Sequence, residues 1–198
     1  MLGLPKATEL NKQLPKNMIY AKFQMNAVAK EQIDKDISRI YIVNEVSATK
    51  MNLSEGEQVK VFFVISILLK SKEFDEKNII TLSKLIPQNV IMVLEYEQEV
   101  KLAIYRIKLL QTSWLPKDEV SLEIKGLDMD SVWENIIVQI GGLTVEQDNT
   151  VDEQIRIDEQ RNKLQKEINR LEKLARAEKQ PKKKFEIVQM INKLKESK

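Results

Sequence analysis

The stretch VFFVISILL, residues 61–69, is the longest apolar run in the chain. Its length is that of a β-strand and is too short for a transmembrane helix. The strand is expected to begin at Val59, where apolar and polar residues alternate. A second run, RIYIV at residues 39–43, has the β-branched and aromatic composition typical of strands. Residues 38–125 therefore predict mainly a β-sheet.

Beyond this strand, the spacing of the apolar residues alternates between that of helices and that of strands. Apolar residues three and four apart over 79–86 predict a short amphipathic helix that ends at a proline. Two apolar runs, 90–94 and 100–110, predict a hairpin with a polar turn at 95–99. Alternating apolar residues predict a last strand over 120–124.

The remainder of the chain has helical patterns. Residues 128–140 predict a helix, with Asp128 or Asp130 accepting from the free amides of its first turn and Gly141-Gly142 ending it. Two apolar stripes at helical spacing follow, and they consist of Ile157, Leu164, Ile168, Leu171 and Ala175, and of Phe185, Val188, Ile191 and Leu194. Helices of this length are not stable alone in water, so we expect an antiparallel helical hairpin, packed on itself or on a partner.

The expected fold is α+β, with a largely antiparallel, mixed sheet, packed helices and a C-terminal helical, coiled-coil hairpin. Residues 1–145 are expected to form the α+β body and residues 146–198 the hairpin. The first helical stripe also provides a candidate interaction seam, formed by Ile157, Leu164, Ile168 and Leu171, through which two copies of the chain could dimerise.

Composition excludes several classes of enzyme. The 198 residues include no cysteine and no histidine, so there is no Ser-His-Asp or Cys-His triad, no disulfide and no zinc or copper site. The chain also lacks the spaced glycines and lysine of a nucleotide-binding loop. No cofactor or metal is expected, except Mg²⁺ or Mn²⁺ in an alternative given below. Without an apolar leader or membrane segment, a cytoplasmic protein with no membrane partner is expected.

Charge is distributed unevenly along the chain. Residues 31–160 contain 14 basic and 24 acidic side chains, whereas residues 161–198 contain 13 basic and 5 acidic ones. The cations expected to face outward on the hairpin are Arg170, Lys173, Arg176, Lys179, Lys182, Lys183 and Lys184. Repeated cations on a rigid element can bind nucleic-acid phosphates, and the same surface can serve as a protein-interaction arm.

Two acid-x-lysine triplets allow an enzymatic alternative. Glu99 and Lys101, and likewise Glu123 and Lys125, are two residues apart on predicted strands, so each pair lies on one face. With an acid from a neighbouring strand, such a pair is typical of a divalent-metal nuclease, in which Mg²⁺ or Mn²⁺ is held against the phosphate. Triplets of this kind are also common by chance in a chain rich in Glu and Lys.

Another group of residues combines an aromatic ring with polar side chains near the end of a predicted strand. Its members are Tyr105, Arg106, Thr112, Ser113 and Trp114. Such a group could hold a base or a peptide, whereas a single tryptophan is more often part of the core edge.

Short motifs along nearly the whole chain resemble one bacterial family of domains of unknown function, number 4391. The motifs are residues 4–9, Asn11-Lys12, Ile86-Pro87, Thr112-Ser113-Trp114, 126–130, and above all the C-terminal run 168–180 with Lys184, Glu186 and Asn192. The resemblance provides no catalytic residues. It implies a place beside helicases and DNA methyltransferases of restriction-like and anti-phage loci.

Together, these observations predict a non-enzymatic accessory protein of a bacterial defence or restriction-type assembly. Its basic hairpin is expected to dock on a partner protein, such as the helicase or methyltransferase of the same locus, or on DNA or RNA. The divalent-metal nuclease is the alternative.

Overall fold

The computed structural model describes residues 2–196 and confirms the α+β class. The chain divides into two compact units, Met1–Thr144, here called the body, and Val145–Lys198, here called the hairpin unit. Each unit is described by itself below.

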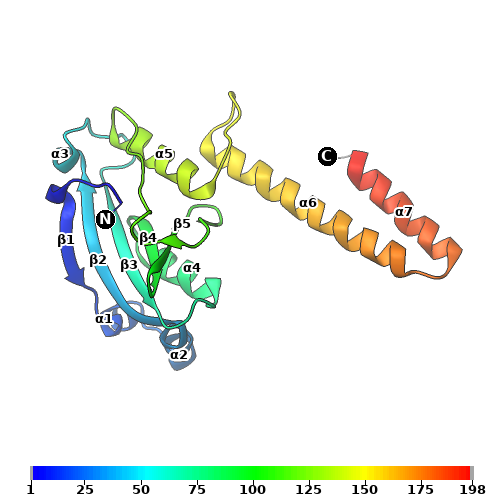
Figure 1. Ribbon diagram of the computed structural model, residues 1–198, viewed down its shortest axis with the longest axis horizontal. Coiled ribbons are helices and arrows are strands. Elements are labelled where there is room, and N and C mark those ends of the chain that lie inside the picture. The colour runs from blue at the N-terminus through cyan, green and yellow to red at the C-terminus, as the bar shows by residue number, and fades with distance from the viewer. Residues whose placement is uncertain (1, 197–198) are drawn as a thin grey trace. The chain divides into compact units, whose positions relative to one another are not determined.

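The body is built on one mixed sheet (Figure 1). Its strands follow the order β1 (Glu9–Gln13), β2 (Ile37–Ser47), β3 (Val61–Leu69), β4 (Asn89–Tyr96), β5 (Glu99–Tyr105) and β6 (Leu109–Gln111), and β7 (Leu115–Pro116) also pairs with β5. Strands β3 and β4 are parallel because α4 (Glu76–Leu85) connects them, and the other described pairings are antiparallel.

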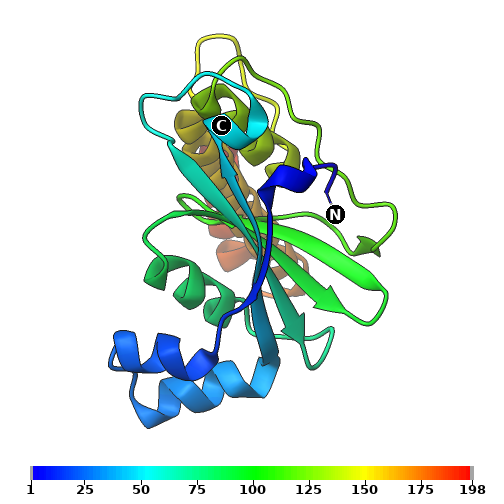
Figure 2. The ribbon, with the colours of Figure 1, turned by 90° about the vertical axis from the view of Figure 1, so that its left-hand side faces the viewer.

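Strand β3 is buried on both sides, which accounts for its continuous apolar sequence. Ile65 and Ile67 belong to a core cluster with residues of α1 (Lys16–Lys22), α2 (Ala27–Asp36) and α4. Figure 2 shows these three helices on the same side of the sheet. From the opposite face, Phe62 contacts Trp133 of α5 (Met129–Gly141), with 5.1 Å between the ring centroids. The short elements η1 (Lys6–Thr8) and α3 (Ala48–Met51) complete the body.

The predicted strand over 100–110 is wrong in its length. The chain turns at 106–108, where the Arg106 amide donates to the Lys108 carbonyl, so β5 and β6 form a second hairpin. The predicted turn at 95–99 is also shorter: Glu95 and Glu99 belong to the strands, and Glu97 reverses the chain with a φ of 52°. Alternation does not distinguish one long strand from two short strands joined by a turn.

The predicted strand over 120–124 does not form. Residues 117–128 make an irregular segment whose only described ladder contacts are isolated bridges at Ser121 and Asp128. Val120 and Leu122 are nevertheless buried. The alternating burial of residues 120–124 thus arises because an extended loop packs on the body, and not because the segment pairs with a strand.

The predicted helix over 128–140 is confirmed. Asp128 caps α5 by accepting a 2.8 Å hydrogen bond from the Ser131 amide. Gly142 ends the helix with a φ of 56°, a left-handed conformation that glycine adopts without steric cost.

The hairpin unit consists of α6 (Val151–Ala177) and α7 (Pro181–Glu196), which runs back alongside α6 (Figure 1). Helix α6 begins with a reciprocal capping box between Thr150 and Glu153. The helices enclose a small core of buried residues, Ile168, Leu171, Ala175 and Ile191, with Leu164, Ile187 and Leu194 packed against it. The predicted helical hairpin is therefore confirmed.

Candidate functional site

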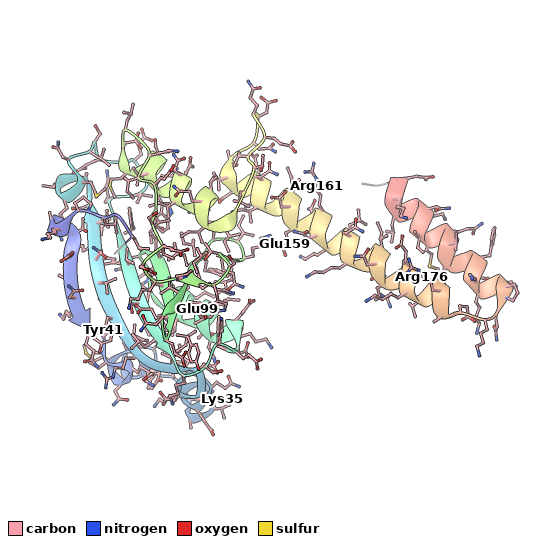
Figure 3. All side chains as sticks on the ribbon, viewed as in Figure 1. Lys35, Tyr41, Glu99, Glu159, Arg161 and Arg176 are labelled. Carbon is pink, nitrogen blue, oxygen red and sulfur yellow. The ribbon has the colours of Figure 1, made fainter. Side chains whose placement is uncertain are left out.

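The predicted cations of the hairpin are all exposed to solvent. Arg170, Lys173 and Arg176 lie on α6 (Figure 3 labels Arg176), whereas Lys179 lies in the connection. A spacing of three residues falls about 60° short of a helical turn, so the cations on α6 spread over its outer surface and do not form a single line.

Only one of these cations is neutralised by a described ion pair. Arg170 donates two hydrogen bonds, of 2.8 and 2.7 Å, to the Glu167 carboxylate, and these bonds hold the pKa of Glu167 below its usual value. The other six predicted cations form no ion pair with any residue in the range 2–196.

Three lysines occupy the first turn of α7. Lys182, Lys183 and Lys184 follow Pro181, and this turn contains no acidic residue. A helix N-terminus carries a partial positive charge, and cations there are unfavourable by roughly 0.3–1 kcal/mol each. The three consecutive lysines of the hairpin therefore lie at the end of α7 where positive charge destabilises the helix.

The predicted interaction seam is largely internal to the hairpin. Ile168 and Leu171 are buried against α7, and Leu164 packs on the same cluster. Ile157 lies on α6 outside this cluster. Because α7 already covers three of the four positions, they are not available for dimerisation of two copies.

The second apolar stripe also differs from its prediction. Helix α7 contributes Ile187, Ile191 and Leu194 to the core, whereas Phe185 and Val188 are 62% and 38% exposed. Leu174 and Met190 are exposed as well, at 45% and 54%. We call these four side chains, Leu174, Phe185, Val188 and Met190, the exposed apolar set. In the sequence, Phe185 and Val188 are at helical spacing from Ile191, and so is Ile187. Only the packing of α7 on α6 decides that Ile187 is the residue that contacts the core.

A shallow hollow lies where the two helices are joined. It has a volume of about 400 Å³ and is lined by Leu174, Ala177, Ile187 and residues 178–180.

The two acid-x-lysine pairs have different positions. Glu99 and Lys101 share a face of β5 (Figure 3 labels Glu99), but Glu99 pairs with Lys72. Glu123 and Lys125 pair with each other on the irregular segment, so their predicted placement on a strand is wrong. Within residues 2–196, no group of three acidic side chains is placed to hold a metal ion.

Hydrogen bonds and ring contacts hold Thr112 and Trp114 in place on the body. The Thr112 hydroxyl accepts from the Leu102 amide at 3.1 Å and donates to the Ser113 carbonyl at 2.8 Å. Trp114 is half-buried and contacts Phe74 edge to face, with ring centroids 6.5 Å apart. The ammonium groups of two lysines lie over its indole ring.

The motif at 126–130 has structural roles. The carboxylate of Asp130 accepts from the backbone amides of Glu57, Gln58 and Val59, at 2.7, 3.2 and 2.6 Å. The amide of Val59, followed by the amides of the other two residues, holds the pKa of Asp130 below its usual value. Gly56 permits this contact, because a Cβ atom there would lie 2.3 Å from the Asp130 carboxylate.

The N-terminal motif at 4–9 is likewise structural. The Thr8 hydroxyl donates to the Pro5 carbonyl at 2.6 Å and accepts from the buried Asn44 amide at 2.8 Å. These bonds attach η1 to β2.

These features define a class of protein: an α+β body followed by a charged helical hairpin. The family model described as Domain of unknown function (DUF4391) matches residues 2–197, and the chain belongs to this family. No curated protein and no solved structure matches the chain. None of the helices within residues 2–196 is long and apolar enough to cross a membrane.

Proposed function

We propose that this protein is a non-enzymatic accessory subunit whose hairpin docks on a partner protein. The observation that carries the proposal is the combination, on one small hairpin, of the exposed apolar set with three lysines at the start of α7. Both features cost stability or solubility in the isolated chain, and an acidic, partly apolar partner surface would relieve both.

The exposed apolar set favours a protein over a nucleic acid. Complete burial of a Val, Leu, Phe or Met side chain contributes about 1.5–3 kcal/mol, whereas an exposed ion pair contributes about 0–1 kcal/mol. The apolar side chains would therefore provide most of the affinity. The cations would provide the association rate and the preference for an acidic surface.

A second copy of the chain fits this surface poorly. Residues 161–198 carry 13 basic and 5 acidic side chains, so two hairpins placed face to face would repel each other. We propose instead a partner encoded in the same locus, a helicase or methyltransferase of a defence or restriction-type assembly. This choice rests on the resemblance described above.

The test is co-expression of the tagged protein with each protein of its own locus, followed by affinity measurement of any complex. Two variants address the hairpin: Lys182→Glu with Lys183→Glu and Lys184→Glu, and Phe185→Ser with Val188→Ser. Each is expected to weaken binding at least tenfold. A matched control, Lys6→Glu with Lys12→Glu and Lys22→Glu, changes the net charge equally on exposed residues of the body and is expected to bind as the wild type does.

Unchanged affinity in both hairpin variants would exclude the hairpin as the docking surface. Salt-sensitive binding of DNA or RNA that is lost in the lysine variant, without capture of a locus protein, would instead make the hairpin a nucleic-acid arm.

A further inference from the structure

One surface of the body carries two aromatic rings, each with lysine ammonium groups over it. The Nζ atoms of Lys72 and Lys101 are 5.6 and 5.5 Å from the ring centroid of Trp114. The Nζ atom of Lys84 is 5.0 Å from the ring centroid of Tyr105. Such contacts occur about once in 70–80 residues, so three on one surface are a local concentration. We call these five side chains the ring–lysine surface.

The two rings belong to one face of the sheet. Lys101 and Tyr105 are four residues apart on β5 and therefore point to the same side, about 13 Å from each other. Of the residues between them, Leu102 and Ile104 are buried on the opposite face, and Ala103, on the same face as Lys101 and Tyr105, is buried in the core cluster. Lys84 reaches the same face from α4.

The positive charge on this surface is only partly neutralised. Lys72 pairs with Glu99, and Glu76 accepts a hydrogen bond from Gln111 nearby. Lys84 and Lys101 form no ion pair with any residue in the described part of the chain. An aromatic ring attracts an ammonium group but does not cancel its charge, so both cations remain available to an anion.

We propose that the ring–lysine surface binds a nucleobase together with its phosphate, as a free nucleotide or as a unit of a single strand. An ammonium–phosphate contact is stronger than an exposed cation–π contact, so Lys72 and Lys101 would move from the indole ring to the phosphate. The vacated face of Trp114 would then stack on the base.

Single-stranded ligands suit this surface better than a duplex. Base stacking on a protein ring requires an unstacked base, which loops and single strands supply. Tyr105 and Lys84 form a second ring and cation farther along β5, where the next part of the strand could lie. The proposal concerns the body alone and does not depend on docking by the hairpin.

The experiment is a fluorescence-anisotropy titration of the full chain with a labelled 12-residue oligothymidylate, with thymidine monophosphate and a 12-base-pair duplex as competitors. The wild type is expected to bind the single strand more tightly than the duplex. Competition by the monophosphate at similar concentrations of nucleotide would identify a free nucleotide as the ligand, and much weaker competition would identify the strand.

Variants assign the binding to individual groups. Trp114→Ala is expected to weaken binding about 5- to 150-fold, the range for loss of one stacked base, and Trp114→Phe much less. Because Trp114 packs on the core cluster, Lys101→Gln is the variant that leaves the fold intact. It is expected to reduce the slope of log affinity against log salt by about 0.7, as expected for one phosphate contact. Lys12→Gln, an exposed lysine on β1, is the matched control with no expected effect.

No binding of any of these ligands by the wild type would overturn the proposal, as would equal binding by the wild type, Trp114→Ala and Lys101→Gln. Loss of oligonucleotide binding in the Lys182, Lys183 and Lys184 charge reversals, with Trp114→Ala unaffected, would transfer the site to the hairpin and also overturn it. Failure of the hairpin to bind a partner protein leaves all these outcomes unchanged.

Discussion

The side chain of Asp130 accepts hydrogen bonds from backbone amides that have no partner in a strand or helix. Its carboxylate accepts three amides from residues 57–59, a segment that no strand or helix satisfies. Close approach is possible because Gly56 has no Cβ atom. Asp130, which belongs to the 126–130 motif, thus joins the start of α5 to the segment before β3.

The depressed pKa of Asp130 predicts how stability changes with pH. Its folded pKa is below the value of about 3.9 expected in the unfolded chain, so the carboxylate stabilises the fold above that pH. The contribution is lost as the pH falls through the folded pKa. Urea unfolding should show Asp130→Asn less stable than the wild type at pH 7, with the gap narrowing toward pH 3. A gap that stays constant with pH would contradict the prediction.

At the scale of elements, α7 shows which apolar residues hold a helix in place. Ile191 is buried in the hairpin core, whereas Phe185, six residues earlier, is 62% exposed. Both are large apolar residues on the same helix, so only their orientation toward α6 differs.

Substitution of these two residues should therefore have unequal effects. Ile191→Ala is expected to destabilise the packing of α7 on α6 by about 2–5 kcal/mol, the usual cost for a buried isoleucine. Phe185→Ala is the control and is expected to change it by less than about 0.5 kcal/mol. Amide hydrogen exchange of α7 measures both, and equal protection of α7 in the two variants would refute the assignment of the core.

The first turn of α7 should show a conflict between stability and binding. Replacing Lys182, Lys183 and Lys184 by Glu places acidic groups at a helix N-terminus, which favours the helix by roughly 0.3–1 kcal/mol for each charge that is placed there. We expect increased exchange protection of α7 together with weakened partner binding. Reduced protection would show that these lysines stabilise the helix.

At the scale of the whole molecule, the internal seam and the charge of residues 161–198 predict a monomer. Leu164, Ile168 and Leu171 already pack within one hairpin. Light scattering at about 0.15 M and 1 M salt should give the mass of one chain, because salt screens repulsion without creating an apolar interface. A dimer that persists in 1 M salt would require an apolar interface elsewhere.

Local signals in the sequence were sufficient for elements whose determinants are local. Asp128 and Gly142 bound α5, the apolar run at 61–69 forms β3, and the stripes at helical spacing predict α6 and α7. No element was predicted over the first 36 residues, where α1 has seven residues and buries only Ile19 and Tyr20, although Asn26 is a local N-cap of α2.

Properties that depend on a partner element required the tertiary structure. Alternation at 120–124 describes burial equally well with or without a neighbouring strand, and spacing alone does not choose between Phe185 and Ile187 for the core of the hairpin. Likewise, Lys72 in one loop and Lys101 on β5 both contact Trp114 in another loop, and these three segments are separate in sequence. Sequence patterns report local periodicity, whereas which surface is covered depends on contacts between distant segments.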